Sequence, residues 1–111
     1  MAELKINTEI DLENALDSRR AILMYFSTLS CSVGEALEPK VRALIQEKYP
    51  LIDFAWIDMN AMPEVSAQNQ VFVEPTLLLF IDGREHMRKS RNVHLSDLDR
   101  SIQRIYELAF D

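Results

Sequence analysis

The chain has 111 residues, 48% of them hydrophobic, and a formal net charge of −6. This composition fits one compact domain over residues 1–111, and the acidic balance argues against nucleic acid as a partner, because phosphate binding depends on clustered Lys and Arg. A single cysteine excludes an intramolecular disulfide framework and favours a reducing compartment. The N-terminus is charged and no apolar run approaches the length of a membrane span, so we expect a soluble, cytoplasmic protein with no membrane partner.

Hydrophobic periodicity and turn residues divide the chain into nine expected elements in the order β-α-β-α-β-α-β-β-α. In chain order they are a strand at residues 4–6, a helix after Thr8, a strand at 21–26, a helix at 33–49, a strand at 51–57, a helix at 64–70, strands at 75–81 and 84–91, and a helix from Ser96. The pattern predicts an α/β layered fold with a central mixed five-stranded sheet flanked by four helices.

Local signals support this division. The segment Thr8–Asp11 resembles a capping box at the start of the first helix, and Ser96–Asp99 resembles another at the start of the last. Residues 21–26 are apolar throughout, which is typical of a central strand covered on both faces. Asp82–Gly83 between two strand patterns indicates a hairpin, which places residues 84–91 at a sheet edge.

The polar residues of this last strand have simple explanations. Edge strands carry charge to block pairing with other chains, which accounts for Arg88, Lys89 and Arg91 better than a role in docking an anion or a protein. His86 and His94 lack the spacing to cysteine or acids that a metal site needs, so we expect solvated histidines and no metal.

Cys31 is the only cysteine, and it stands between an expected strand and an expected helix. A thiol there lies at the positive end of a helix dipole, beside backbone N–H groups without partners, which favours the thiolate nucleophile. Three residues later, where a dithiol partner is usual, the chain has Gly34. The alternative is that Cys31 is a small, inert residue at a helix start.

Three features together resemble the thioredoxin family. They are the segment Phe26–Cys31, Pro39 eight residues after the cysteine, and Pro75–Phe80 followed by Asp82–Gly83. The resemblance covers nearly the whole chain and implies a single thioredoxin-fold domain. It also implies a cis Pro75 packed beside Cys31, with neighbouring backbone that pairs with an extended substrate segment by strand addition.

The departures from the family pattern are at positions that take part in the family's redox chemistry. Thioredoxins have Trp-Cys-Gly-Pro-Cys where residues 30–34 of this chain are Ser-Cys-Ser-Val-Gly, so the resolving thiol and the aromatic wall are both missing. Tyr25 takes the position of a buried aspartate, and Trp56 that of a lysine close to it. We predict that Tyr25 and Trp56 are in contact and form an apolar replacement for that ionic pair.

Two acidic residues are expected to affect the ionisation of the Cys31 thiol. Glu74 precedes Pro75, where the family usually has a small or apolar residue, and Glu35 lies in the first helical turn after Cys31. A carboxylate within about 4–6 Å disfavours a thiolate, whereas a helix N-terminus favours it. We expect Glu74 to lie close to the sulfur and to oppose its ionisation.

The resemblance implies a thioredoxin-like protein that acts in thiol–disulfide chemistry through Cys31, by mixed disulfides with a protein or a low-molecular-weight thiol. Dithiol thioredoxin activity is not expected, no cofactor is expected, and an iron–sulfur role is disfavoured because one cysteine supplies too few ligands. The expected substrate-binding residues around Cys31 are Ser30, Ser32, Val33, Gly34, Glu74 and Pro75. The alternative is a redox-inactive module that binds an extended peptide or protein partner. Oligomeric state and physiological partner stay open.

Overall fold

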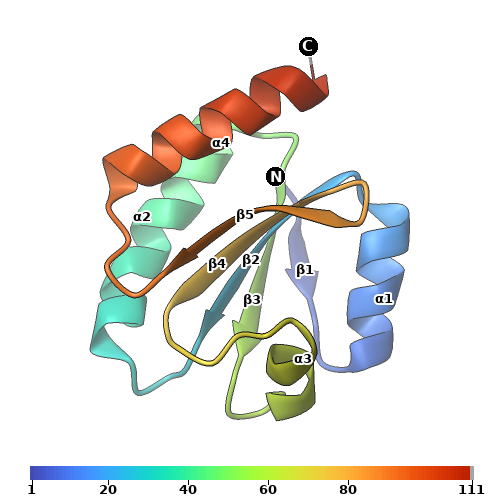
Figure 1. Cartoon of the computed structure of the whole chain (residues 1–111), viewed down its shortest axis with the longest axis vertical. Helices are drawn as coiled ribbons and strands as arrows, with labels where there is room; N and C mark the ends of the chain where they lie inside the picture. Colours follow the sequence, from blue (N-terminus) through green and yellow to red (C-terminus); the bar gives the residue numbers. More distant parts are fainter. Residues whose placement is uncertain (111) are drawn as a thin grey trace.

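Strands and helices follow one another in the predicted order β-α-β-α-β-α-β-β-α (Figure 1). The computed structural model describes residues 1–110. The strands are β1 (Glu3–Lys5), β2 (Ala21–Ser27), β3 (Asp53–Asp58), β4 (Thr76–Ile81) and β5 (Arg84–Ser90); the helices are α1 (Glu9–Ser18), α2 (Ser32–Lys48), α3 (Pro63–Gln68) and α4 (Leu95–Phe110). The sheet has the strand order β1-β3-β2-β4-β5, with β1, β3 and β2 parallel and with β4 and β5 antiparallel to their neighbours.

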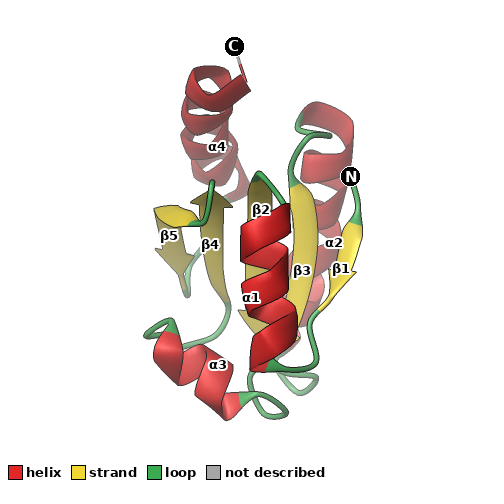
Figure 2. Cartoon of the chain, turned by 90° about the vertical axis from the view of Figure 1, so that its right-hand side faces the viewer, coloured by secondary structure: helices red, strands yellow, loops and turns green. Residues whose placement is uncertain are grey.

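Helices cover both faces of the sheet (Figure 2), and each face has its own hydrophobic core. Successive residues of a strand point to opposite faces, so Leu23 and Tyr25 of β2 pack under α2 and α4, whereas Met24 and Phe26 pack under α1 and α3. All seven residues of β2 are buried, because the strand is central and covered on both sides. The expected α/β fold with a mixed five-stranded sheet and four helices is confirmed.

Two of the local signals are confirmed in detail. Thr8 Oγ1 accepts a hydrogen bond from the backbone N–H of Asp11 at 3.1 Å, and the Asp11 carboxylate accepts one from the backbone N–H of Thr8 at 3.2 Å. Asp82 and Gly83 both have positive φ, 51° and 80°, as a two-residue hairpin of the favoured twist requires. This turn leaves β5 at the edge of the sheet.

The predicted capping box at Ser96–Asp99 is wrong. Helix α4 begins one residue earlier, at Leu95, and its first turn is closed by the Leu98 N–H donating to His94 O at 3.0 Å. The Asp99 carboxylate instead accepts hydrogen bonds from Lys48 Nζ, at 2.7 and 2.9 Å, and from the Tyr49 hydroxyl. A partner 50 residues away in sequence competes with the local cap, and it ties the end of α2 to α4.

Two basic residues of the edge strand β5, Arg88 and Lys89, have different surroundings. The Arg88 side chain is bound within the fold: its guanidinium donates to the carbonyls of Asn69 and Gln70, at 2.7 and 3.0 Å, and to the Glu85 carboxylate. Lys89 has no such partner within residues 1–110 and lies on the same face of the strand as the core residue Met87, two residues before it.

Candidate functional site

Cys31 lies at the start of helix α2, a few residues after the central strand β2. Strand β2 ends at Ser27, a short turn follows, and Cys31 is the N-cap residue of the 17-residue helix α2, with extended backbone angles of −84° and 102°. Its sulfur accepts a hydrogen bond from the backbone N–H of Gly34 at 3.3 Å, and its carbonyl accepts one from Glu35 at 2.8 Å. The thiol thus satisfies one of the free N–H groups that every helix start has.

The Cys31 sulfur lies where the N–H groups of the first turn of α2 converge. The N–H groups of the first turn and the positive end of the helix dipole both stabilise an anion at the N-cap position. Cys31 is partly exposed and has no disulfide partner, so a reagent can approach the sulfur from solvent. The placement of the thiol at a helix start, predicted from the sequence, is confirmed.

A neighbouring side chain leaves no room for a Cβ atom at residue 34, where the resolving cysteine is missing. Gly34 is buried, and a Cβ atom at residue 34 would collide with Ser27 Oγ and lie 3.3 Å from Cys31 Sγ. Ser27 is itself 1% exposed. The sequence analysis did not identify Ser27, because its closeness to Gly34 depends on how β2 packs against α2.

Tyr25 is an anchor for this helix start. The fully buried Tyr25 hydroxyl donates to the Gly34 carbonyl at 2.6 Å, and its ring packs against Phe54 with centroids 6.1 Å apart. Burial, followed by the charges of Glu38 and Cys31, raises the pKa of Tyr25, so the hydroxyl stays a hydrogen-bond donor. Tyr25 and Trp56 belong to the same hydrophobic core cluster, and the predicted apolar pair did not include this hydrogen bond of the Tyr25 hydroxyl.

Trp56 is the register partner of Tyr25 across β2 and β3, and its indole lines a hollow of about 200 Å³ next to Gly34. The acids that share this hollow are Glu35 and Glu38. Glu38 is half-buried and accepts a hydrogen bond from Arg42 at 2.6 Å; burial raises the pKa of its carboxyl. This side of the helix start is therefore acidic.

Glu74 lies in a different environment from these acids. Its side chain is exposed, and within residues 1–110 it forms no ion pair or hydrogen bond. The hollow beside Gly34 contains Glu35 and Glu38 and not Glu74.

The segment before β4 lies where β2 ends. Phe26 pairs with Thr76, which brings Pro75 to the same end of the sheet as the Cys31 turn. The Glu74–Pro75 peptide bond is cis, Pro75 is buried, and its carbonyl accepts a hydrogen bond from the Arg91 N–H at 2.9 Å. Within residues 1–110, the backbone N–H and carbonyl of Glu74 have no hydrogen-bond partner.

A larger hollow of about 560 Å³ opens on the other side of α2. It is lined by Ser32, Val33, Ala36, Leu37 and Lys40 of α2 and by residues 91–94 of the β5–α4 loop. The structure therefore adds this loop to the sequence-predicted residues; no spacing signal in the sequence connects it with Cys31. Ser30 is exposed and directly precedes the cysteine, with its hydroxyl 3.3 Å from that of Thr28.

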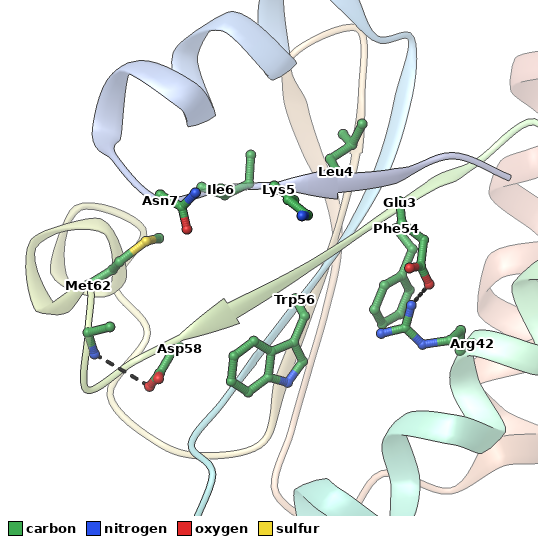
Figure 3. Close-up of a pocket in the computed structure, with 11 residues that line it drawn as sticks. Glu3, Leu4, Lys5, Ile6, Asn7, Arg42, Phe54, Trp56, Asp58 and Met62 are labelled. Carbon is green, nitrogen blue, oxygen red and sulfur yellow. Dashed lines mark hydrogen bonds and ion pairs between the residues drawn. The ribbon is translucent and has the colours of Figure 1, made fainter.

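A third hollow, of about 450 Å³, lies at the β1 side of the sheet and does not contain Cys31 (Figure 3). Trp56 lines this hollow as well as the one beside Gly34, with its indole between Asp58 and Arg42 in the view shown. Arg42 is paired with Glu3 at one end of the hollow and lies over the Phe54 ring, 4.4 Å from its centroid.

Two kinds of feature were sought in the described part of the chain. In residues 1–110, no cluster of three or more His, Cys, Asp or Glu side chains has the arrangement of a metal site. None of the helices in this part combines the length and the apolar character that crossing a membrane requires.

A mixed sheet of this strand order, with a cysteine at the N-cap of the helix after its central strand, defines a thioredoxin fold. A family model described as Thioredoxin matches residues 3–104, and the chain belongs to the thioredoxin family, which acts in thiol–disulfide chemistry on protein thiols and disulfides.

Two curated relatives and one solved structure each cover more than four fifths of the chain. The Thioredoxin-like protein YdfQ of Bacillus subtilis is 32% identical over 103 residues, which are 93% of this chain and 91% of that protein. The thioredoxin of Chlamydia trachomatis is 33% identical over 86% of this chain and 92% of its own. The X-ray structure of Fasciola hepatica thioredoxin superposes with a TM-score of 0.80 at 31% identity, covering 94% of this chain and 98% of that one.

Proposed function

We propose that this protein carries out thiol–disulfide exchange through Cys31 alone. The Cys31 thiolate attacks one sulfur of a disulfide, a new S–S bond forms to Cys31, and the other sulfur leaves as a thiolate. Because the chain has no second cysteine, an external thiolate must then attack the mixed disulfide and release Cys31. The partners are protein thiols and disulfides or a low-molecular-weight thiol.

One observation carries this proposal: a partly exposed Cys31 sulfur accepts the Gly34 N–H at the start of a 17-residue helix. The N–H groups and the helix dipole stabilise the thiolate that the first step needs. The groups assigned to substrate contact are those predicted from the sequence: Ser30, Ser32, Val33, Gly34, Glu74 and Pro75. We extend the proposal to residues 1–111 acting as one domain and to a reducing, cytoplasmic location, which a single free cysteine suits.

Mass spectrometry of the reduced protein tests the proposal. The protein is mixed with oxidised glutathione and, separately, with a peptide disulfide, and the adduct mass is followed over time. We expect one adduct per chain, absent in Cys31→Ser and reversed by excess free thiol. A wild-type protein that forms no adduct faster than an unfolded cysteine peptide would refute single-thiol exchange.

The second candidate is a redox-inactive module that binds an extended peptide. The unpaired backbone N–H and carbonyl of Glu74, within the described residues 1–110, favour it, because these groups can pair with an added strand without any thiol chemistry. Peptide binding measured with Cys31→Ser distinguishes the two functions: an adaptor keeps its affinity, whereas a partner held through a mixed disulfide is lost.

A further inference from the structure

The charges of this chain are segregated between two parts of the fold. Residues 84–104 contain six of the twelve lysines and arginines but only three of the eighteen acids, so this segment has a formal charge of +3 and the rest of the chain −9. The segment comprises β5, the loop after it and the first half of α4. Half of the basic residues of this acidic chain are thus concentrated in one segment.

Four of these six cations, together with Lys40 of α2, line two hollows. The hollow of about 560 Å³ beside Ser32 and Val33 contains Lys40 and Arg91 and no acid. The second hollow, of about 350 Å³, lies between β5 and α4 and contains Lys89, Arg100, Arg104 and one acid, Asp97. We call Lys40, Lys89, Arg91, Arg100 and Arg104 the cationic track.

Most of the cationic track is available to a partner. Within residues 1–110, only Arg100 of the track forms an ion pair, with Asp97; the other four cations have no carboxylate within 4.0 Å. Arg88, by contrast, is bound to Glu85 and to the end of α3 and is not part of the track. The explanation of the basic cluster as edge protection therefore fits Arg88 less well than a structural role, and it leaves Lys89 and Arg91 open to a partner.

One end of the track lies in a hollow that the residues following Cys31 line. Ser32 and Val33, which directly follow Cys31, share a hollow with Lys40 and Arg91, whereas the hollow on the other side of the helix start contains the acids Glu35 and Glu38. A partner approaching Cys31 therefore meets positive charge on the β5–α4 side and negative charge on the β3 side. Such a field orients a charged partner before contact.

We propose that the cationic track docks an acidic segment of a partner protein, and that this segment flanks the cysteine or disulfide brought to Cys31. The occupant is a short acidic segment rather than a long polyanion, because the charge of −9 over the remaining residues repels an extended polyanion that runs beyond the track. The link to Cys31 rests on the proposed function; the docking surface itself does not.

The rates at which Cys31 reacts with activated peptide disulfides test the link between the cationic track and the thiol. Three peptides of equal length contain one cysteine as a mixed disulfide with 2-thiopyridine, flanked by glutamate, serine or lysine. Cys31 attacks the peptide sulfur, the S–S bond to the pyridine ring breaks, and the released pyridine-2-thione is measured by its absorbance. At about 0.01 M salt we expect the glutamate peptide to react about tenfold faster than the lysine peptide, and this ratio to approach 1 at about 1 M salt.

Two variants with the same change in net charge test whether the cationic track causes the preference for the glutamate peptide. Lys89→Glu/Arg104→Glu changes the track, and Arg19→Glu/Arg84→Glu makes the same change in net charge in the hollow beside the Asp82–Gly83 turn, at the other end of β5. We expect the first variant to lose the preference for glutamate and the second to keep most of it. Equal losses in both would assign the effect to net charge and overturn the track.

Binding without thiol chemistry separates the surface from the function. Isotope-labelled Cys31→Ser is titrated with a glutamate-rich peptide that has no cysteine, and amide shifts are followed by NMR. We expect changes in residues 89–104 that disappear in Lys89→Glu/Arg104→Glu and are absent with a lysine-rich peptide. No shifts there would refute the docking surface even if Cys31 reacts, whereas shifts with an inert thiol would keep the surface and refute the exchange reaction.

Discussion

Gly34→Cys adds a second sulfur three residues after Cys31, and the structure predicts both a gain of activity and a cost in stability. The new Cβ atom lies 3.3 Å from Cys31 Sγ, so the two sulfurs are within reach of one another. The same Cβ collides with Ser27 Oγ, which is buried and must move. Ser27→Ala removes the colliding atom, and the double variant is therefore the better test of the resolving thiol.

The expected changes in the free energy of unfolding follow from the packing around residue 34. Forcing an extra group into a filled site costs about 1–3 kcal/mol, and replacing a helical glycine returns about 0.3 kcal/mol, so Gly34→Cys should be destabilised. Ser27→Ala alone should cost less than about 1 kcal/mol, because its hydroxyl makes one long bond, 3.5 Å to the Thr28 carbonyl. The double variant should recover about 1–2 kcal/mol relative to the sum of the single changes.

Urea unfolding measures the coupling, and reduction of insulin by dithiothreitol measures the activity. Gly34→Ser is the control without a thiol: it should show the same steric cost and the same relief by Ser27→Ala, but no gain in insulin reduction. Additive free energies of unfolding would show that Ser27 turns aside freely and that the packing argument is wrong. A double variant that forms a disulfide between Cys31 and the introduced cysteine, yet reduces insulin no faster than the wild type, would contradict the role assigned to the missing thiol.

Three further changes probe how the site is held. Tyr25→Phe removes a buried bond to the first turn of α2 and should cost about 1–2 kcal/mol in urea unfolding; no cost would refute the anchor. Asp99→Asn should cost about 1 kcal/mol at pH 7. Lys48 and Tyr49 hold the pKa of Asp99 below its ordinary 3.8, so this stability is lost as pH falls through the folded pKa; a gap between wild type and variant that stays open at lower pH would contradict the assignment. Arg88→Ala should speed amide exchange in the α3–β4 loop about tenfold while α1 keeps its rates.

Local chemistry explains why much of this molecule was predictable from its sequence. The Thr8–Asp11 box and the Asp82–Gly83 hairpin depend on residues next to one another in the chain, and both formed as predicted. The placement of Cys31 at a helix start likewise depended on a strand pattern followed directly by a helix pattern.

What the sequence analysis missed has a common cause in contacts between different elements of the fold. Asp99 was assigned to a cap within its own helix, but Lys48 and Tyr49 reach it from α2. Tyr25 was predicted as part of an apolar pair, but the packing of α2 on β2 gives its hydroxyl the Gly34 carbonyl as acceptor. In each case a hydrogen bond between two elements decided the outcome, because a buried or partly buried polar group must find a partner.

The sequence by itself determined the fold, the single thiol and its position at the N-terminus of a helix, since hydrophobic periodicity, turn residues and cysteine count are properties of the chain. Tertiary structure decided what surrounds that thiol. The Ser27 hydroxyl occupies the space that a Cβ atom at residue 34 would need, the acids Glu35 and Glu38 line the hollow on one side of the helix start, and Lys40 and Arg91 line the hollow on the other. Ser27, Glu35 and Glu38 are close to Cys31 in the chain, whereas Arg91 comes from the β5–α4 loop and is brought to the start of α2 only by the packing of the helices on the sheet.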